Sequence, residues 1–268
     1  KAIQLARFLE GDTKKGFEFS KPGLNRLTLI KFSHNQTRLV WSFHHIILDG
    51  WSLPIVMREL FVSYSELVKG NIPRLPSPPK YHQFIAWLSR NDASEAAQFW
   101  QSYLAGFNAP TLITVKKNAE RVGKTEQQSK MSVYQEQELS VYQERELSLS
   151  TTTTASLQAL AKNQHLTFNT LLQGAWGLLL SRYSGEQDVV FGTTVSGRPA
   201  ELNDVENIVG LFINTLPLRL RIEKNQPLIT LLQTMQNMQI ESRRFESTPL
   251  VDIHHVSEVP GDQPLFES

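Results

Sequence analysis

One continuous segment of the sequence constrains the fold more than any other. An apolar stretch over Leu39–Ile47 predicts a β-strand, and the Asp49-Gly50 pair after it predicts a turn. The next residues, Pro54–Lys69, place their apolar side chains at helical spacing and predict a helix that ends at Gly70. A strand that turns directly into a helix is typical of α/β proteins, and the end of such a strand is a common place for chemistry.

The rest of the chain repeats this exchange of strand and helix patterns. A strand at Leu27–Phe32 comes first and is joined to the next by a polar turn at Ser33–Gln36. The later patterns predict strands at Asp188–Val195 and Asn214–Ile222, and helices at Ala93–Leu104, Thr154–Asn163, Phe168–Arg182 and from Pro227 to about Phe245. The expected fold class is therefore α/β.

Two of these elements carry strong local patterns. In the strand Asn214–Ile222, aliphatic side chains alternate with Arg219 and Arg221, which predicts one buried face and one face that carries the arginines. The helix that begins after Thr167 is predicted to be capped by this residue and to close near Gly185.

Charge and composition exclude several classes of function. The chain has 27 basic and 26 acidic residues, a net charge of +1, and this balance gives no footprint for nucleic acid or an acidic membrane surface. It has no cysteine, so disulfides, thiolate metal sites and a cysteine nucleophile are excluded. The most apolar run, Leu171–Leu180, is interrupted by Gln173 and two glycines and is too short and polar to span a bilayer.

The adjacent pair His44 and His45 is the most distinctive chemical feature. On a strand these two side chains point to opposite faces, so at most one can address a substrate while the other belongs to the interior. Neighbouring strand histidines cannot share one metal ion, and the other histidines offer no His-x-x-x-His spacing. No Gly-x-Ser-x-Gly elbow is present. What remains for one of them is a neutral imidazole that acts as a base or hydrogen-bond partner, beside a purely structural role.

Asp49 has two interpretations. It could orient an imidazole, as the acidic member of a catalytic triad does. It could instead pair with an arginine and fix the turn, which we favour because a buried carboxylate is costly unless it is paired.

Four segments resemble one known family. Residues 44–52, His-His-Ile-Ile-Leu-Asp-Gly-Trp-Ser, resemble the His-His-x-x-x-Asp-Gly motif of condensation domains from nonribosomal peptide synthetases. Further matches in order and spacing are Tyr81–Trp87, with Gln83 in place of the usual Asp, Asp188–Leu202, and the Gly-x-Phe-x-Asn-Thr pattern within Val209–Arg219. The resemblance covers nearly the whole chain. The family's upstream Arg-His-Glu-x-Leu-Arg element and its final motif are absent.

The resemblance implies an architecture. Such a domain has two chloramphenicol acetyltransferase-like lobes in a V-shaped pseudo-dimer, which would here be truncated at both ends. Residues 1–110 would form the C-terminal part of the N-lobe with the histidine motif, residues 111–130 the inter-lobe connection, and residues 131–268 most of the C-lobe.

The resemblance also implies an activity. The family forms peptide bonds between carrier-bound aminoacyl or peptidyl thioesters, as an amide-forming acyltransferase. The implied partners are donor and acceptor peptidyl carrier proteins and an adjacent adenylation domain of a cytoplasmic megasynthase. The domain itself would bind no cofactor and no metal, because phosphopantetheine arrives on the carriers. The Asp-Gly-Trp-Ser form is most similar to domains that join an L-configured donor to an L-configured acceptor.

Catalytic roles follow residue by residue from the family motif. His45 would face the reaction centre, and His44 and Asp49 would be structural. The family's Asp pairs with an arginine of the absent upstream element, so Asp49 is expected to lack its partner. Gly50 would permit the turn and let the substrate arm approach.

Substrate-binding candidates lie beside the motif and in two later segments. Trp51 and Ser52 would shape the site and start the helix. Arg198 and Asn214 are further candidates, although a loop-stabilising role is favoured for both.

Two alternatives to peptide-bond formation stay open. One is another acyltransferase with the same motif, of the wax-ester or coenzyme A-dependent type. The other is a non-catalytic recruitment module of a synthetase, which the retained His45 disfavours.

A tandem repeat, Ser132–Leu139 followed by Ser140–Leu147, has no counterpart in the motif pattern. We interpret it as a surface extension rather than a binding element, because loops and edges accept insertions readily.

Overall fold

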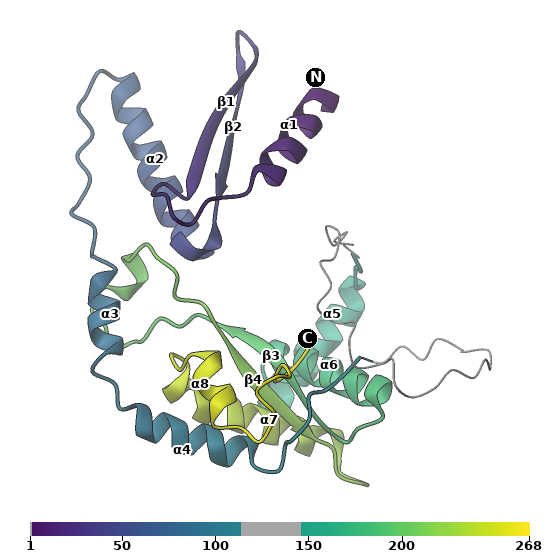
Figure 1. Cartoon of the computed structure of the whole chain (residues 1–268). Helices are drawn as coiled ribbons and strands as arrows, with labels where there is room; N and C mark the ends of the chain where they lie inside the picture. Colours follow the sequence, from purple (N-terminus) through teal and green to yellow (C-terminus); the bar gives the residue numbers. More distant parts are fainter. Residues whose placement is uncertain (1, 114–145) are drawn as a thin grey trace, which may run out of the picture. The chain divides into compact units, whose positions relative to one another are not determined.

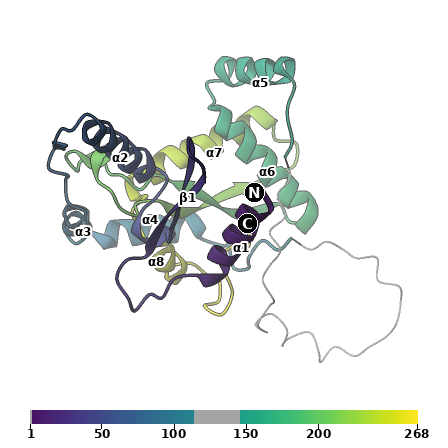
Figure 2. The same cartoon turned by 90° about the horizontal axis from the view of Figure 1, so that it is seen from above.

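The computed structural model of the chain describes residues 2–113 and 146–268 (Figures 1 and 2). The chain divides into two compact units. Unit 1 comprises Lys1–Ala96, Thr194–Thr215 and Glu246–Leu250, and unit 2 comprises Ala97–Thr193, Leu216–Phe245 and Val251–Ser268. Each unit is therefore assembled from three stretches of sequence, whereas the predicted lobes are continuous. The predicted lobe boundaries stay a prediction, and all but the last two residues of the tandem repeat lie outside the described residues.

Unit 1 contains an antiparallel hairpin. Strand β1 (Asn25–Ser33) pairs with β2 (Gln36–Phe43) around a two-residue turn, which confirms the predicted strand pair. The predicted end of the second strand at Ile47 is wrong. Strand β2 ends at Phe43, because His44 caps a 3-10 turn (η1, His45–Ile47) that takes the chain out of the sheet.

Helix α1 (Ala2–Lys15), which the sequence patterns did not predict, is tied to this hairpin. The Asp12 carboxylate accepts a hydrogen bond from the Arg26 Nε of β1 at 2.9 Å and another from the Ser42 hydroxyl of β2. The Arg26 guanidinium also stacks on the ring of Phe17, 4.2 Å from its centroid. One arginine thus joins the helix, the loop after it and the sheet.

Helix α2 (Ser52–Val68) confirms the predicted helix and begins slightly earlier than expected. The chain reverses at Gly70, whose φ of 79° lies in the left-handed region that favours glycine. The proline-rich loop leads to a short helix, α3 (His82–Leu88), which was likewise not predicted.

A small apolar core connects α3 with the second stretch of unit 1. Phe84 of α3 packs with Val205 of the 3-10 turn η2 (Val205–Asn207), and with Ile208 and Phe212 beyond it. Side chains of Tyr81, Trp87, Leu88 and Leu202 surround this cluster. The core therefore fixes the loop of residues 202–212 beside helix α3.

Unit 2 contains the second sheet and most of the remaining helices. Strands β3 (Asp188–Val195) and β4 (Asn214–Arg221) pair with each other. The helices are α4 (Ala93–Leu104), α5 (Thr151–Asn163), α6 (Phe168–Ser184), α7 (Leu228–Ser242) followed by the 3-10 turn η3 (Arg243–Phe245), and α8 (Leu250–His255). The predicted strands and helices are confirmed here, apart from small shifts at their ends and the unexpected α8.

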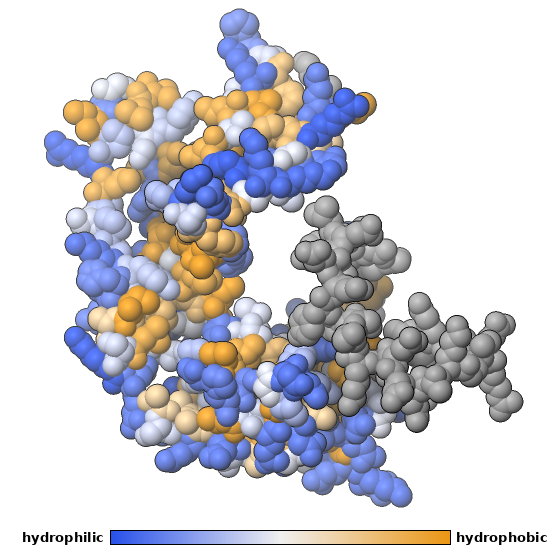
Figure 3. Space-filling model, in the orientation of Figure 1, coloured by the Kyte–Doolittle hydropathy of each residue, from blue (hydrophilic) through white to orange (hydrophobic). Residues whose placement is uncertain are grey.

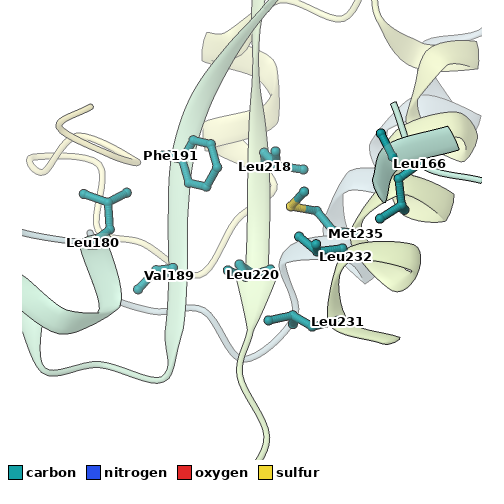
Figure 4. Packing of buried hydrophobic residues seen from close by; sticks show 10 residues of the cluster. Leu166, Leu180, Val189, Phe191, Leu218, Leu220, Leu231, Leu232 and Met235 are labelled. Carbon is teal, nitrogen blue, oxygen red and sulfur yellow. The ribbon is translucent and has the colours of Figure 1, made fainter. Parts of the chain in front are cut away.

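The main core of unit 2 forms where helices α6 and α7 meet the sheet (Figure 4). Phe191 of β3 and Leu220 of β4 lie within this cluster, together with Leu180, Leu232 and others. Helix α6 approaches the sheet closely at Gly177, because a Cβ there would overlap the Leu220 side chain. Thr167 caps α6 and Gly185 closes it at a φ of 82°, as predicted.

Strand β4 is buried on both faces, and here the alternation pattern is wrong about one residue. Arg221 is exposed as expected, but Arg219 is only 7% exposed. Its guanidinium binds the Asp188 carboxylate at 2.8 and 2.6 Å and the carbonyl oxygens of Tyr103 and Ala105. The end of α4 and the loop after it cover this face, and these distant contacts leave no trace in a local pattern.

Unit 1 exposes many apolar side chains. Figure 3 shows hydrophobic residues at the surface over the part that holds the hairpin and α2. The most exposed of these are Leu27, Leu29, Phe61, Tyr64, Leu67 and Val68. None of the helices in the described part of the chain is long and apolar enough to cross a membrane.

Candidate active site

The histidine pair lies at the exit from the first sheet and not on a strand. His44 is extended, with φ −84° and ψ 136°, and caps the turn η1 that begins at His45. The premise that the two rings lie on opposite faces of one strand is therefore wrong. The two side chains differ in environment because His44 caps the turn and His45 lies within it.

His44 is held in place by local contacts. Its Nδ1 accepts a hydrogen bond from the N–H of Ile46 at 3.1 Å, and its own N–H donates to the carbonyl oxygen of Leu24 at 2.9 Å. Its ring packs edge-on against Phe19, with 4.7 Å between the ring centroids, and near Phe17. These contacts agree with a structural role for His44.

His45 is in the opposite situation, because its side chain is exposed. Its backbone belongs to the turn η1. The far end of this turn is anchored by two buried residues, Leu48 and Asp49. An exposed imidazole on an anchored turn is available to a reacting group.

Asp49 is the buried anchor of the motif, with 1% of its surface exposed. Its Oδ1 accepts from the N–H and hydroxyl of Ser52 at 3.0 and 2.9 Å, and its Oδ2 accepts from the N–H of Phe212 at 3.1 Å. The Nη2 of Arg198 lies 3.2 Å from Oδ1 and 3.4 Å from Oδ2. Both interaction partners and burial favour the turn-fixing interpretation of this aspartate.

Arg198 shows that the expectation of an unpaired Asp49 is wrong. The partner is present in this chain, 149 residues further along, and 5% of its side chain is exposed. Its Nη1 also donates to the carbonyl oxygens of Val205 and Ile208, and its guanidinium lies 4.0 Å from the centroid of the Phe212 ring. These contacts agree with the predicted loop-stabilising role of Arg198. Substrate binding by Arg198 stays a prediction.

The charge state of Asp49 follows from these partners. Burial tends to raise the pKa of its carboxyl, but the N–H of Phe212, the hydroxyl and N–H of Ser52 and the charge of Arg198 outweigh burial and lower this pKa. Asp49 is therefore a carboxylate at neutral pH, with its oxygens already engaged.

Ser52 continues the anchor into helix α2. It is fully buried, and its hydroxyl oxygen accepts from the N–H of Gly210 at 3.1 Å and lies 3.0 Å from the Gly210 carbonyl oxygen. Trp51, one position earlier, is 58% exposed and begins the helix without a side-chain cap. These contacts agree with a structural role for Ser52, and substrate binding by Ser52 and by Trp51 stays a prediction.

Gly50 and Asn214 take roles that differ in part from those expected. Gly50 is exposed, its φ is not positive, and a Cβ would meet open space, so the turn itself does not require a glycine. The Asn214 amide donates to the carbonyl oxygens of Glu246 and Thr248 at 2.9 and 2.6 Å. These bonds agree with loop stabilisation by Asn214, and both the approach of a substrate arm to Gly50 and ligand binding by Asn214 stay predictions.

The sequence analysis did not predict some of the contacts that support the motif. The backbone of residues 210–212 supplies partners to both Asp49 and Ser52, and Tyr81 lies against it. Gly197 allows the backbone of Phe212 to approach closely, because a Cβ at position 197 would overlap the Phe212 carbonyl oxygen. Its φ of 62° also favours glycine. The family resemblance had marked both segments, Tyr81–Trp87 and Val209–Arg219, but a sequence pattern cannot show which distant backbone supplies donors to a buried aspartate.

No group of three or more histidine, aspartate or glutamate side chains within residues 2–113 and 146–268 is placed to hold a metal ion.

The family of the chain follows from its comparison with known proteins. A family model of the condensation domain matches residues 1–268. The chain belongs to the condensation domain family. The wax-ester and coenzyme A-dependent alternatives are not favoured, and the roles assigned to the motif residues stay predictions.

The relatives of this condensation domain are components of large peptide synthases. Two of them belong to the linear gramicidin synthase of Brevibacillus parabrevis, and the domain is 42% identical to one over 261 residues and 44% identical to the other over 264 residues. A third is bacitracin synthase 3 of Bacillus licheniformis, at 38% identity over 262 residues. The alignments cover 97%, 98% and 96% of this chain but only 3%, 5% and 4% of the three relatives. The condensation domain therefore matches one small part of each synthase.

Solved structures show the same fold. The first condensation domain of the calcium-dependent antibiotic synthetase, in complex with a substrate analogue, has a TM-score of 0.71 at 18% identity and covers 98% of this chain. The X-domain from teicoplanin biosynthesis has a TM-score of 0.71 at 20% identity and covers 94%. The condensation domain spans 57% and 56% of those two chains. The shared fold is chloramphenicol acetyltransferase-like.

Proposed function

We propose that this condensation domain takes part in peptide-bond formation between two carrier-bound thioesters. The observation that carries the proposal is the exposed His45 on a turn whose buried end is fixed by Asp49 and Arg198. The relationship to synthases of linear gramicidin supports the same chemistry. The active unit would be a pseudo-dimer of two lobes, V-shaped and including chain beyond these residues.

The reaction follows from the position of one imidazole. The amine nitrogen of the acceptor attacks the carbonyl carbon of the donor thioester, so that the C–N bond forms and the C–S bond breaks. One proton leaves the nitrogen, is accepted by His45 and is passed to the departing thiolate. Phosphopantetheine supplies both sulfurs from the carriers, so the chain needs no cysteine.

Positioning contributes more than proton transfer in this scheme. A free α-amine has a pKa of about 7.7–8.0, so a useful fraction is already neutral at physiological pH. A general base accelerates such a step by about 10²–10⁴-fold. Holding both reactants in place gives effective molarities of about 10⁵ M or more. His45 therefore mainly orients the amine and accepts its proton late.

The remaining assignments belong to the same proposal. Trp51 would contact the substrate arm beside Gly50, and Arg198 and Asn214 would act through the loops they hold. The partners would be donor and acceptor carrier proteins and an adenylation domain of a cytoplasmic synthetase. The substrates would be an L-configured donor and an L-configured acceptor.

A recruitment module is the second candidate, because a solved structure of a complex between the teicoplanin X-domain and OxyB also has this fold, with a TM-score of 0.73. Fold alone does not separate the two functions. The exposed His45 favours catalysis, since a surface used only for docking does not need an imidazole on an anchored turn.

The test is peptide-bond formation by the full synthetase with two loaded carriers, followed by intact mass spectrometry. His45→Ala should reduce the rate by about 10²–10⁴-fold while product still forms above the uncatalysed rate. His34→Ala, which removes an exposed histidine from the β1–β2 turn, is the matched control and should be neutral. Wild-type turnover by His45→Ala would remove this residue from the mechanism, and transfer from coenzyme A in place of a carrier would favour the other acyltransferases.

A further inference from the structure

Tyr81 lies against the backbone that anchors the histidine motif. It immediately precedes helix α3, and its hydroxyl donates to the carbonyl oxygen of Leu211 at 2.5 Å. Its ring lies over Gly210 so closely that a Cβ at this position would overlap the ring. The edge of the ring also packs against Phe212, with ring centroids 5.3 Å apart at 84°. Tyr81 thus contacts three consecutive residues, 210 to 212.

The same three residues support the motif from the other side. The carbonyl oxygen of Gly210 accepts from the N–H of Asp49 at 3.2 Å, and the N–H of Gly210 donates to the Ser52 hydroxyl at 3.1 Å. The N–H of Phe212 donates to the Asp49 carboxylate at 3.1 Å. Residues 210–212, which we name the anchor strip, therefore lie between Tyr81 and the buried end of the turn that carries His45.

The electrostatics of Tyr81 agree with this close association. Burial raises the pKa of its hydroxyl, and the nearby charge of Asp49 raises it further while Arg198 acts in the opposite sense. The hydroxyl therefore remains protonated at neutral pH and can donate to the Leu211 carbonyl oxygen.

We propose that Tyr81 is a positioning residue for the condensation reaction, which acts on His45 through the anchor strip and Asp49. This inference rests on the proposed role of His45. Without the Tyr81 hydroxyl, the Leu211 carbonyl loses its partner and the strip can shift. The turn between Asp49 and His45 would then shift with it, and a misplacement of about 1 Å can reduce an oriented reaction by about 10²-fold.

The proposal explains why position 210 is a glycine. The φ of Gly210 is not positive, so backbone freedom is not the reason. The reason is space, because any side chain would displace the Tyr81 ring from the strip. Gly210 and Tyr81 should therefore behave as one unit when both are changed.

A double-mutant cycle in the full synthetase tests this path. Tyr81→Phe keeps the ring but removes the hydroxyl, and we expect about a tenfold loss in kcat with a smaller change in KM. In a His45→Ala background the same substitution should change the rate by no more than about twofold, because the imidazole it positions is gone. An equal loss in both backgrounds would overturn the proposal. Tyr183→Phe, which removes an exposed hydroxyl from α6, is the matched control.

A second measurement does not depend on turnover. Hydrogen exchange by mass spectrometry on the same full-length variants should show faster exchange of the peptide with residues 44–52 in Tyr81→Phe, since the Asp49 N–H bonds to the Gly210 carbonyl oxygen of the strip. A peptide from α6 should be unchanged, and unchanged exchange at 44–52 would contradict the proposal. If His45→Ala turns over at the wild-type rate, the proposed role of His45 fails, whereas faster exchange in Tyr81→Phe would still establish the contact between Tyr81 and the motif.

Discussion

At the residue scale, the site depends on one buried ion pair. Asp49 and Arg198 are both almost fully buried, and every contact made by Asp49 lies within unit 1. The motif itself predicted a buried aspartate that fixes a turn, and this interpretation agrees with the structure. The identity of the arginine was not predictable from the motif, because a pattern of nine residues contains no information about a partner 149 residues away.

Arg198→Met should destabilise the fold because it leaves the Asp49 carboxylate buried without its positively charged partner. Removal of one member of a buried ion pair costs about 3–5 kcal/mol, because the other charge stays buried without its partner. Urea unfolding of the purified chain measures this loss, and exposed Arg90→Met is the control. Adding Asp49→Asn to Arg198→Met should restore part of the stability, and a double variant no more stable than Arg198→Met would contradict the stranded-charge explanation.

At the element scale, local rules account for most of what could be predicted. Helices α5 and α6 begin after capping residues, Ser150 and Thr167, whose side chains accept from the N–H three residues later. Local rules did not predict the burial of Arg219 in β4. Both of its faces are covered, and Arg219 is buried because α4 brings carbonyl oxygens to it. Likewise β2 stops at Phe43 because a histidine side chain caps the next turn, a competition that apolar patterning does not detect.

The cap of α6 offers a clean test of the local rules. Thr167→Ala removes the acceptor for the Thr170 N–H and should reduce the free energy of unfolding by about 1 kcal/mol. Thr167→Ser keeps the hydroxyl and should lie within a few tenths of a kcal/mol of the wild type. Chemical denaturation of the two variants measures the difference, and equal losses in both would mean that the methyl group rather than the cap matters.

At the scale of the whole molecule, stability should depend on acid pH. Several carboxyl groups between residues 10 and 92 have lowered pKa values, Asp49 among them through the donors described above. A folded-state pKa below the unfolded one means that the unfolded chain binds more protons, so stability falls as pH falls. The contribution of Asp49 is present above about pH 4, the ordinary pKa of an aspartate, and is lost as pH falls through its lowered folded-state pKa.

Asp49→Asn separates this residue from the other carboxyl groups. The stability difference between wild type and variant should be largest above about pH 5 and should shrink below about pH 4. Denaturation curves at a series of pH values from about 3 to 7 measure it. A difference that does not change with pH would show that the pKa of Asp49 is the same in the folded and unfolded chain.

The long sequence separations in the anchor also bear on the order of assembly. Asp49 and Ser52 bond to residues 158 to 163 positions later in the chain. During synthesis Phe212 must therefore leave the ribosome before Asp49 and Ser52 can form these bonds. His44 and His45 emerge much earlier. The nascent motif is completed late, and chains that stall before that point lack the distant partners of the Asp49 end of the turn.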